Sequence, residues 1–531
     1  MALIERFQGL TVGSALANRA TADPSQPYLR FRDQTVSYGQ VESDAEALAA
    51  ALVNLGMEAG DRIALVLPPC PEFVVSMFAA AKLGAVIVPL NPRLTSTELQ
   101  YMLRHSEATC VVTIEEAQGV DYLQLFEDLM PQLPELQYLV TVGDEELWFD
   151  DRTFQFEDLI SAGAGRDYSA VLPDSSAETF ALVYTSGTMG KPKGVELSHD
   201  NLLAAAAGMA DTIGLAADDR VIGVSALYHV FGLGPGLLST LLAGSSIVLQ
   251  EDTDPAATLD QIERLRATVH YGIPTLFVAE LAQLQSRSRD VSSLRLALLA
   301  GAPVGDELVR EIEAELGATV LCAYSVTETS SAVSCSRPSD PAEKRRFTVG
   351  RPLPGTTVRI LETDGSELPV ESVGEIGVKG PGVMRGYYRQ PRETVAAFDG
   401  DGYFLSGDLG LIDEEGYLHL VGRRKDVIIR SGFNVYPREV EARIESHPAV
   451  QEVAVVGLAD SLLGEAICAC VVPVEGAIVT GREVVHWCRE TLADDKVPDL
   501  VRFLDELPRT DTGKVRRVEL SRLAQSGGRS A

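Results

Sequence analysis

The sequence predicts an α/β protein: two doubly wound α/β subdomains and a small β-barrel or distorted sheet, followed by a small α+β C-terminal domain. Three successive patterns along the 531 residues support this prediction. Apolar runs alternate with amphipathic segments up to about residue 335, short strands with tight turns follow from about 348, and helices and strands mix again after 426. A chain of this length also exceeds one ordinary hydrophobic core.

The alternating region opens with a strand–helix–strand unit. Its parts are IALVLP (63–68), PEFVVSMFAAAKLG (71–84) and AVIVPL (85–90). Such alternation predicts parallel strands with helices on both faces. Further strand-like runs are FALVY (180–184), VIGVSAL (221–227), SSIVLQ (245–250), VHYGIP (269–274), LRLALLAG (294–301) and TVLCAY (319–324), and DPAATLDQIERLRA (254–267) has a helical pattern. Because one sheet would not comfortably hold so many strands, we expect two subdomains, ending at about residue 347.

Residues 348–422 change to short strands punctuated by DG, GY and EEG turns, which predicts the barrel-like subdomain. Its strands are TTVRIL (356–361), GEIGVKG (374–380) and YLHLVG (417–422). We therefore assign residues 1–422 to a large N-terminal domain. After a charged run at 423–426, residues 427–531 predict an α+β domain with strands VQEVAVVG (450–457) and AICACVVPV (466–474) and helices REVEARIESH (438–447) and REVVHWCRETLA (482–493).

Residues 221–250 contain no formally charged side chain, as a membrane span would. Three glycines, Pro235 and His229 interrupt the segment. A buried strand, a loop and a buried helix at LLSTLLAG (237–244) explain it better, so we expect no membrane span.

Composition excludes several classes of function. The net charge is 45 − 76 = −31 and no basic tract stands out, so nucleic acid is not an expected partner. Seven cysteines without a C-x-x-C pair argue against a zinc site or a disulfide framework and favour a reducing compartment. Glu5 and Arg6 lie where a secretory signal would be apolar. We expect a cytoplasmic protein.

The most informative segment for function is YTSGTMGKPKGV (184–195), which directly follows the apolar run FALVY. Glycines let the backbone approach a ligand, and successive N–H groups in such a bend form a concavity for anions. The spacing is not that of the ordinary P-loop. The segment therefore predicts a polyphosphate cradle. Its candidate phosphate-binding residues are Thr185, Ser186, Gly187, Thr188, Gly190, Lys191 and Lys193.

This loop closely resembles the phosphate-binding loop of the adenylate-forming superfamily, which includes acyl-CoA synthetases, firefly luciferase and the adenylation domains of peptide synthetases. Eight further motifs follow in that family's order, so chance agreement is negligible. They are HDN (199–201), YHVFG (228–232), GAP (301–303), YSVTE (324–328), FLSGDLG (404–410), the pair GRRKD (422–426) and SGFNVYPREVE (431–441), and PRTDTGKVRR (508–517).

The resemblance implies a reaction in two halves. A carboxylate first attacks the α-phosphorus of ATP, giving an acyl-adenylate and pyrophosphate, and the thiol of coenzyme A then expels AMP. Lys514 corresponds to the catalytic lysine that bridges carboxylate and phosphate oxygens. Glu328 corresponds to the Mg²⁺ ligand, and Thr327 beside it to a phosphate contact.

The resemblance also assigns the nucleotide site and a hinge. Asp408 would accept hydrogen bonds from the ribose hydroxyls, with Arg423 as a second ribose partner. Tyr324 would stack on adenine, beside a flat wall formed by the GAP motif. That wall consists of Gly301, Ala302 and Pro303. Lys425 falls on the hinge residue between the N-terminal domain and a mobile C-terminal domain.

Family position assigns an acyl pocket and a tunnel for the coenzyme A arm. The pocket residues are His229, Val230, Phe231, Ser325 and Val326, and the tunnel residues are Ser431, Gly432 and Phe433. A histidine in an apolar run is also compatible with a satisfied core position. Amino-acid-activating relatives carry an aspartate in the 228–232 block to hold an ammonium group, and this chain has none, so a plain fatty or aryl acid is expected. Ser325 replaces the usual glycine and would narrow the pocket or make it more polar.

Two alternatives to an acyl-CoA synthetase remain open at this point. The acyl group could pass to an acyl carrier protein, although residues 360–380 have no room for the insertion usual in such ligases. The chain could also be a non-catalytic relative, which the presence of Lys514, Glu328 and Asp408 argues against. Both a monomer and a homodimer fit the sequence.

Overall fold

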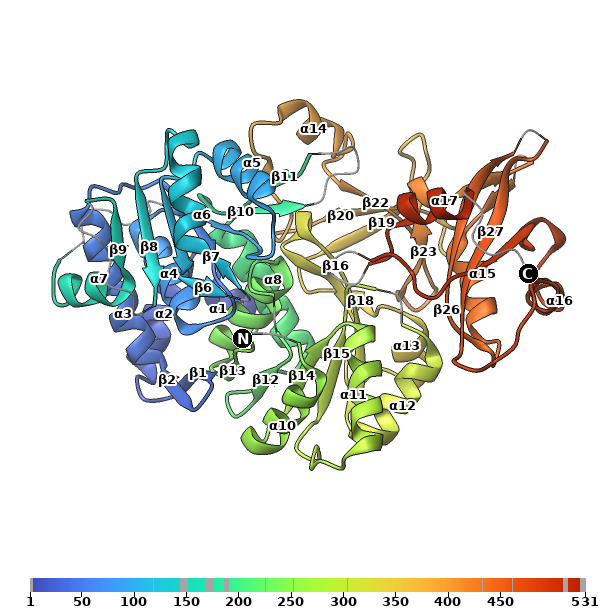
Figure 1. The fold of residues 1–531 in the computed structure, drawn as a ribbon, viewed down its shortest axis with the longest axis horizontal. Coiled ribbons are helices and arrows are strands. Elements are labelled where there is room, and N and C mark those ends of the chain that lie inside the picture. The colour runs from blue at the N-terminus through green and yellow to red at the C-terminus, as the bar shows by residue number, and fades with distance from the viewer. Residues whose placement is uncertain are drawn as a thin grey trace.

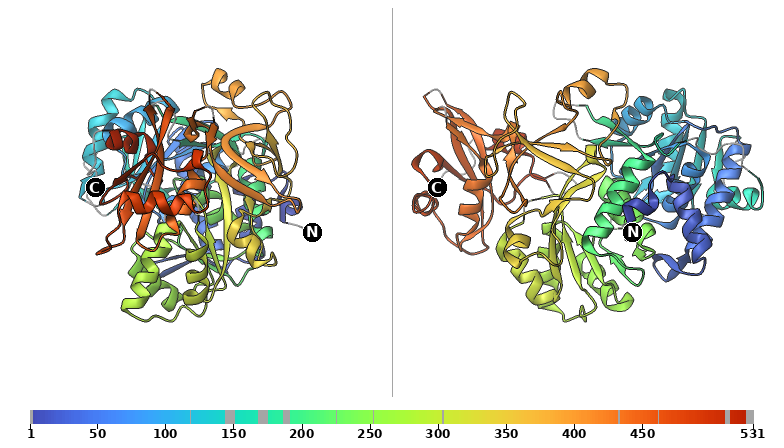
Figure 2. Two further views of the ribbon diagram at one scale, coloured as in Figure 1. Left: turned by 90° about the vertical axis from the view of Figure 1, so that its right-hand side faces the viewer. Right: turned by 180° about the vertical axis from the view of Figure 1, so that it is seen from behind.

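The computed structural model describes residues 3–117, 119–143, 151–167, 175–185, 191–224, 226–251, 253–302, 304–431, 433–460, 462–509 and 514–525. Figure 1 shows the first 140 residues at one end of the molecule and the C-terminal unit at the other, and the rear view in Figure 2 agrees. The helices are α1 (Leu3–Phe7), α2 (Val12–Ala22), α3 (Tyr38–Asn54), α4 (Pro71–Leu83), α5 (Ser96–Ser106), α6 (Tyr122–Leu129), α7 (Phe156–Gly163), α8 (His199–Ile213), α9 (Ser239–Ala243), α10 (Pro255–Leu265), α11 (Pro274–Ser286), α12 (Asp306–Leu316), α13 (Ala342–Phe347), α14 (Pro391–Ala396), α15 (Pro437–Glu445), α16 (Gly481–Arg489) and α17 (Arg517–Gln525).

The first α/β subdomain is built on a largely parallel sheet of eight strands within the described residues. Their order is β21 (Gly386–Tyr387), β11 (Lys193–Ser198), β10 (Thr179–Thr185), β4 (Val86–Pro89), β3 (Arg62–Val66), β5 (Cys110–Ile114), β8 (Tyr138–Val142) and β9 (Thr153–Gln155). Alternate residues of β3 enter different cores: Ile63 packs with α4, whereas Ala64 packs with α5 and α6. Helices therefore cover both faces, as the β3–α4–β4 pattern predicts.

A second sheet, with nine strands among the residues described, carries the other α/β subdomain. Its order is β18 (Arg351–Pro352), β17 (Ser331–Cys335), β16 (Thr319–Val326), β15 (Leu296–Leu299), β14 (Val269–Gly272), β12 (Arg220–Ile222), β13 (Ser246–Val248), β1 (Pro27–Phe31) and β2 (Gln34–Ser37). The central strands are parallel. Leu298 of β15 faces the large core that both subdomains share, and Leu299 faces the core under α11 and α12. Two doubly wound subdomains are confirmed.

The uncharged segment 221–250 differs in detail from its prediction. The strand β12 is shorter than the apolar run, and a π-helix, η3 (Gly232–Leu238), replaces the expected loop and leads directly into α9. Pro235 inside the helix lacks an N–H, which helps explain the departure from α-helical bonding. A Cβ on Gly236 would lie 2.7 Å from Val224 Cγ1, so the glycine permits close packing. No helix in the described part of the chain is long and apolar enough to cross a membrane.

The expected barrel is, in the described residues, an antiparallel sheet of four strands. Their order is β19 (Thr357–Leu361), β20 (Gly374–Lys379), β22 (Phe404–Ile412) and β23 (Leu418–Arg423). In the part of the chain that the structure describes, the two edge strands of this order, β19 and β23, do not pair with each other, and the short strand β21, which precedes β22 in sequence, pairs with β11 of the first subdomain. Residues 386–387 thus connect the small sheet to the large one.

The C-terminal unit is an α+β structure, as predicted. Within the described chain its sheet joins β25 (Phe433–Val435), β24 (Ile428–Arg430), β27 (Gly464–Pro473) and β26 (Val450–Asp460), with β28 (Leu500–Phe503) beside β27. Helices α15 and α16 pack on one face of this sheet and α17 on the other, because Val455 and Val456 of β26 belong to different cores. The last helix, α17, directly follows the segment that carries Lys514.

Candidate active site

The β22–β23 hairpin places Asp408 opposite Arg423 at its open end. Arg423 Nε lies 3.1 Å from Asp408 Oδ1, and the Tyr324 hydroxyl donates to Asp408 Oδ2 at 2.7 Å. Burial, and then the negative charge of Asp408, raise the pKa of Tyr324, so its hydroxyl remains a donor. Three of the six predicted nucleotide residues therefore form one cluster, joined by an ion pair and a hydrogen bond.

Glu328 lies in the short 3₁₀ turn Thr327–Thr329 that ends β16. Its main-chain oxygen accepts a bond from the Met384 amide at 2.8 Å, and Tyr387 donates its hydroxyl to Glu328 Oε1 at 2.9 Å. The chain then turns sharply through Ser330, at φ 58°, into β17. Glu328 is thus held from the segment around β21, which lies far from it in sequence.

The two ends of the predicted phosphate loop are paired strands. Thr185 ends β10 and Lys193 begins β11, and the two residues are register partners. Lys193 Nζ lies 4.5 Å from the centre of the Tyr387 ring, and Lys191 Nζ lies 5.4 Å from that of Tyr101. Both lysines therefore stand next to the strand pair that carries the loop. The other predicted loop residues, Ser186, Gly187, Thr188 and Gly190, lie outside the described residues.

Lys514 joins this cluster from the C-terminal unit. Although the side chain retains exposed surface, desolvation lowers the pKa of its ammonium group, and the charge of Arg423 lowers it further. The carboxylates of Asp408 and Glu328 oppose that effect. The hinge candidate Lys425 lies in the turn Arg424–Asp426, and its positive charge also lowers the pKa of Lys514, by less than the other groups change it. The charges predicted to act on the nucleotide therefore gather around Lys514.

His229 is electrostatically linked to the same lysine. Loss of solvent around the ring, and then the positive charge of Lys514, lower the pKa of His229 to about 4. The imidazole is therefore neutral at pH 7, and its Nδ1 accepts a bond from the Phe231 amide at 3.3 Å. This electrostatic link to a catalytic candidate favours a role for His229 in the active site over a purely structural role in the core.

The other acyl-pocket candidates lie around this histidine in sequence or on β16. Val230 is fully buried in the shared core, and the Phe231 ring packs 5.6 Å from that of Tyr271. Ser325 Oγ lies 3.3 Å from Ser331 Oγ, and Val326 is partly buried. Val230 thus packs in the hydrophobic core, whereas the hydroxyl of Ser325 is hydrogen-bonded to that of Ser331.

The remaining predicted residues lie just after β15, which pairs with the strand that carries Tyr324, and in the β24–β25 hairpin of the C-terminal unit. Gly301 adopts φ 87° at the end of β15, a conformation that favours glycine, and Ala302 follows it, but Pro303 lies outside the described residues. Ser431 and Phe433 belong to the β24–β25 hairpin, where the Ser431 amide donates to the Leu463 carbonyl at 2.7 Å. Gly432 between them is also outside the described residues. The predicted tunnel residues thus bond within the C-terminal unit.

Tyr387 is a site residue that the sequence analysis missed. It contacts both Glu328 and Lys193, yet it lies in RGYY (385–388), which matches none of the motifs used above. No regular spacing links it to the phosphate loop. Only the pairing of β21 with β11, which joins residues nearly 200 positions apart, brings it there.

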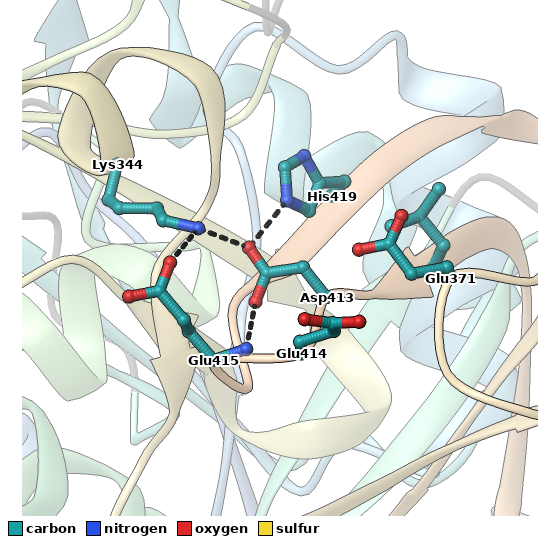
Figure 3. Close-up of a pocket in the computed structure, with 7 residues that line it drawn as sticks. Lys344, Glu371, Asp413, Glu414, Glu415 and His419 are labelled. Atoms are coloured by element: carbon teal, nitrogen blue, oxygen red, sulfur yellow. Dashed lines mark hydrogen bonds and ion pairs between the residues drawn. The ribbon is translucent and has the colours of Figure 1, made fainter.

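A cavity of about 530 Å³ lies at the other end of the β22–β23 hairpin (Figure 3). Lys344 Nζ bonds Asp413 there at 2.7 Å, and His419 Nε2 lies 3.1 Å from the same carboxylate. These bonds hold the pKa of Asp413 well below its usual range despite the opposing effect of burial. The acidic side chain of Asp413 in this cavity is thus paired with Lys344 and His419. None of the predicted catalytic residues is among the described residues that line it.

Comparison with known proteins agrees with the geometry. A family model described as AMP-binding enzyme matches residues 16–388, and one described as AMP-binding enzyme C-terminal domain matches residues 439–514. Feruloyl-CoA synthase of an Amycolatopsis species is 35% identical over 518 residues, which cover 97% of this chain and 99% of that protein.

Two solved structures show how closely the fold is shared. ATP-bound MatB from Rhodopseudomonas palustris has a TM-score of 0.86 and 32% identity, covering 97% of this chain and 99% of the other. The anthranilate CoA ligase AuaEII, in complex with anthranoyl-AMP, has a TM-score of 0.88 and 27% identity, covering 98% of both chains.

Proposed function

Because the chain belongs to the AMP-binding enzyme family, we propose that it is an acid–thiol ligase that converts a carboxylic acid into its coenzyme A thioester through an acyl-adenylate. The observation that carries this proposal is geometric: Arg423 Nε lies 3.1 Å from Asp408 Oδ1, and Tyr324 donates to Asp408 Oδ2 at 2.7 Å, which gathers three of the residues assigned to the nucleotide. Desolvation and then Arg423 lower the pKa of the Lys514 ammonium group, and Asp408 and Glu328 raise it, so Lys514 lies within electrostatic reach of that cluster. A lysine so placed can attract both the carboxylate of the acid and the phosphates of ATP.

In the first half-reaction, an oxygen of the acid attacks the α-phosphorus of ATP and pyrophosphate leaves. We assign Asp408 and Arg423 to the ribose, because they already form a polar pair that hydroxyl groups can join. We assign Lys193 and Thr185, which are register partners at the two ends of the phosphate loop, to the leaving pyrophosphate. Positioning and charge supply most of the rate acceleration in such a reaction.

The Mg²⁺ implied by the family resemblance fits the donor chemistry around Glu328. Mg²⁺ is commonly held by one or two carboxylates together with phosphate oxygens. In the described part of the chain no group of three or more His, Cys, Asp or Glu residues is arranged to hold a metal ion. We therefore assign Glu328 as the protein ligand. The ion, when bound, supplies positive charge to the pyrophosphate group.

We propose a plain fatty or aryl acid as substrate. His229 is neutral, so it can donate a hydrogen bond to a carboxylate without adding a second full charge beside Lys514. The block Tyr228–Gly232 offers no acidic side chain for an ammonium group. Feruloyl-CoA synthase and the anthranilate CoA ligase, by their names, act on aromatic acids, which supports including aryl acids in this class.

Free coenzyme A is favoured over a carrier protein as the acceptor. The connection between β19 and β20 folds back on itself, with the Leu368 amide donating to the Ile360 carbonyl at 2.8 Å and Leu361 bridging to Glu367. This compact turn has no inserted element of the kind expected for carrier-protein ligases.

ATP–pyrophosphate exchange with a series of acids, from acetate to palmitate plus benzoate and cinnamate, tests the proposed adenylation. Exchange that depends on one class of acid is the expected result. Addition of coenzyme A or a phosphopantetheinylated carrier protein then identifies the acceptor, and we expect AMP release with coenzyme A. Absence of exchange with every acid would contradict the proposal.

A further inference from the structure

Tyr387 lies between two groups that the proposed function assigns to the pyrophosphate end of ATP. Its hydroxyl donates to Glu328 Oε1 at 2.9 Å, and Lys193 Nζ stands 4.5 Å from the centre of its ring. One side chain thus contacts a candidate metal ligand through its edge and a phosphate-loop cation through its face. A hydrogen bond to a carboxylate is among the stronger kinds in proteins, and a lysine over a tyrosine ring is also attractive.

The main chain around Tyr387 is held on both sides. Tyr387 is the register partner of Val195 in the β21–β11 pairing, and the amide of the next residue, Tyr388, donates to the Gly194 carbonyl at 2.8 Å. The Tyr387 amide itself donates to Thr394 Oγ1 at 2.9 Å. The tyrosine is therefore fixed relative to the strand that begins with Lys193.

The same segment also fixes Glu328 through its main chain, because the Met384 amide donates to the Glu328 carbonyl at 2.8 Å. Tyr387 then orients the side chain from the same segment. A tyrosine hydroxyl is an uncharged donor at neutral pH, because its ordinary pKa is about 10. This bond engages one carboxylate oxygen, Glu328 Oε1, through a neutral donor.

We infer that Tyr387 is a positioning residue for pyrophosphate departure, which couples the orientation of Glu328 to that of Lys193. This inference rests on the proposed function. Within the residues that the structure describes, no ion pair is formed by Lys193, so the ring holds the lysine while its charge stays available to an anion. The hydroxyl that bonds Glu328 is likewise neutral, so the bond does not compensate the charge of the carboxylate. In a direct Lys193–Glu328 ion pair, each charge would be compensated by the other, and neither would be available to the phosphates or to a metal ion.

Tyr387→Phe is the decisive variant, because it keeps the ring under Lys193 and removes only the hydroxyl. Tyr388→Phe is the matched control: its hydroxyl lies 3.4 Å from Glu107 Oε2, away from Glu328. We expect Tyr387→Phe to lower the kcat/KM of ATP–pyrophosphate exchange by about 10-fold or more, as loss of a hydrogen bond to a charged group does. The control is expected to stay within about 2-fold.

Binding measured by calorimetry separates positioning from a general structural role. AMP lacks the β- and γ-phosphates, so Tyr387→Phe is expected to bind AMP as the wild type does while its affinity for MgATP and Mg-pyrophosphate falls. Equal weakening of AMP and MgATP, or unchanged affinity for both with normal exchange, would overturn the inference. Because binding needs no turnover, wild-type protein without exchange would refute the proposed function while leaving this test intact.

Discussion

The two sides of the site are built differently. On the N-terminal side, Asp408 has both oxygens engaged, one by Arg423 and one by Tyr324, and Glu328 is held by Tyr387. The C-terminal side brings one exposed lysine, Lys514, on a segment whose following helix is anchored by Arg517 to Glu441 at 2.8 Å. We therefore propose that one side binds the nucleotide in a prearranged geometry and that the other adds the charge that drives the reaction. Substitutions on the two sides should therefore have separable effects.

Lys514→Ala should show this separation most strongly. Removal of the bridging charge is expected to reduce acyl-adenylate formation by about 100-fold or more, whereas coenzyme A transfer from a synthetic acyl-adenylate remains largely intact. Rapid-quench assays of the two half-reactions measure the difference. Lys496→Ala is a suitable control, because Lys496 belongs to the same unit but pairs with Glu439. Equal losses in both half-reactions would show that Lys514 is structural.

Lys425→Pro should produce the opposite pattern. Lys425 lies between Arg424, which pairs with Glu375, and Asp426, which pairs with Arg517, so it links contacts to both sides. Proline fixes φ and is expected to block a rotation of the C-terminal unit between the half-reactions. Adenylation should survive while thioester formation falls by at least about 10-fold.

Lys425→Ala, which keeps backbone freedom, should retain both half-reactions. If Lys425→Pro retains full overall turnover and unchanged thermal stability, Lys425 is not a hinge residue. The proposed rotation of the C-terminal unit at this position is then wrong.

Sequence reasoning reached most of the N-terminal side because its motifs are local. Asp408 and Glu328 each lie in a short sequence motif, and the apolar periodicity predicts the β3–α4–β4 unit. Tyr387 was missed because its role arises from a strand pairing between distant segments. The π-helix Gly232–Leu238 was missed because a proline and three glycines usually mark a loop, and only tight packing against Val224 and Ser330 favours a helix there.

Ser325→Gly should alter the choice of acid without changing the division between half-reactions. Ser325 Oγ bonds the hydroxyl of Ser331, and we place it beside the acyl passage. Removing one or two heavy atoms from a pocket changes relative kcat/KM by about 10–200-fold, here toward longer or bulkier acids. The measurement is the ratio of kcat/KM for two acids that differ by two to four carbons.

Ser331→Ala controls for loss of the hydroxyl pair, because it breaks the same contact without enlarging the passage at position 325. If Ser325→Gly leaves the ratio unchanged while activity is retained, Ser325 does not line the acyl passage, and the N-terminal side selects its acid elsewhere.

The smallest effect concerns two histidines that are alike in pKa but differ in location. The pKa of His229 is lowered to about 4 by desolvation and by Lys514, and that of His199 to about 4 by burial alone. Both native pKa values lie below the ordinary value near 6.5. Between about pH 6.5 and 4 the unfolded chain therefore binds more protons than the folded one. Stability should fall as the pH falls through that window.

Lys514→Ala distinguishes the two histidines. Removing the lysine charge should raise the pKa of His229 by a fraction of a unit to about one unit, short of 6.5 because desolvation persists. The pKa of His199, which stacks on Phe180 in the shared core, should not change. NMR titration of histidine-labelled protein, with the two signals assigned by His229→Gln and His199→Gln, measures both values. If the pKa of His229 does not change, Lys514 does not act electrostatically on the ring in solution. The C-terminal unit then does not bring Lys514 to His229 in the way the structure shows.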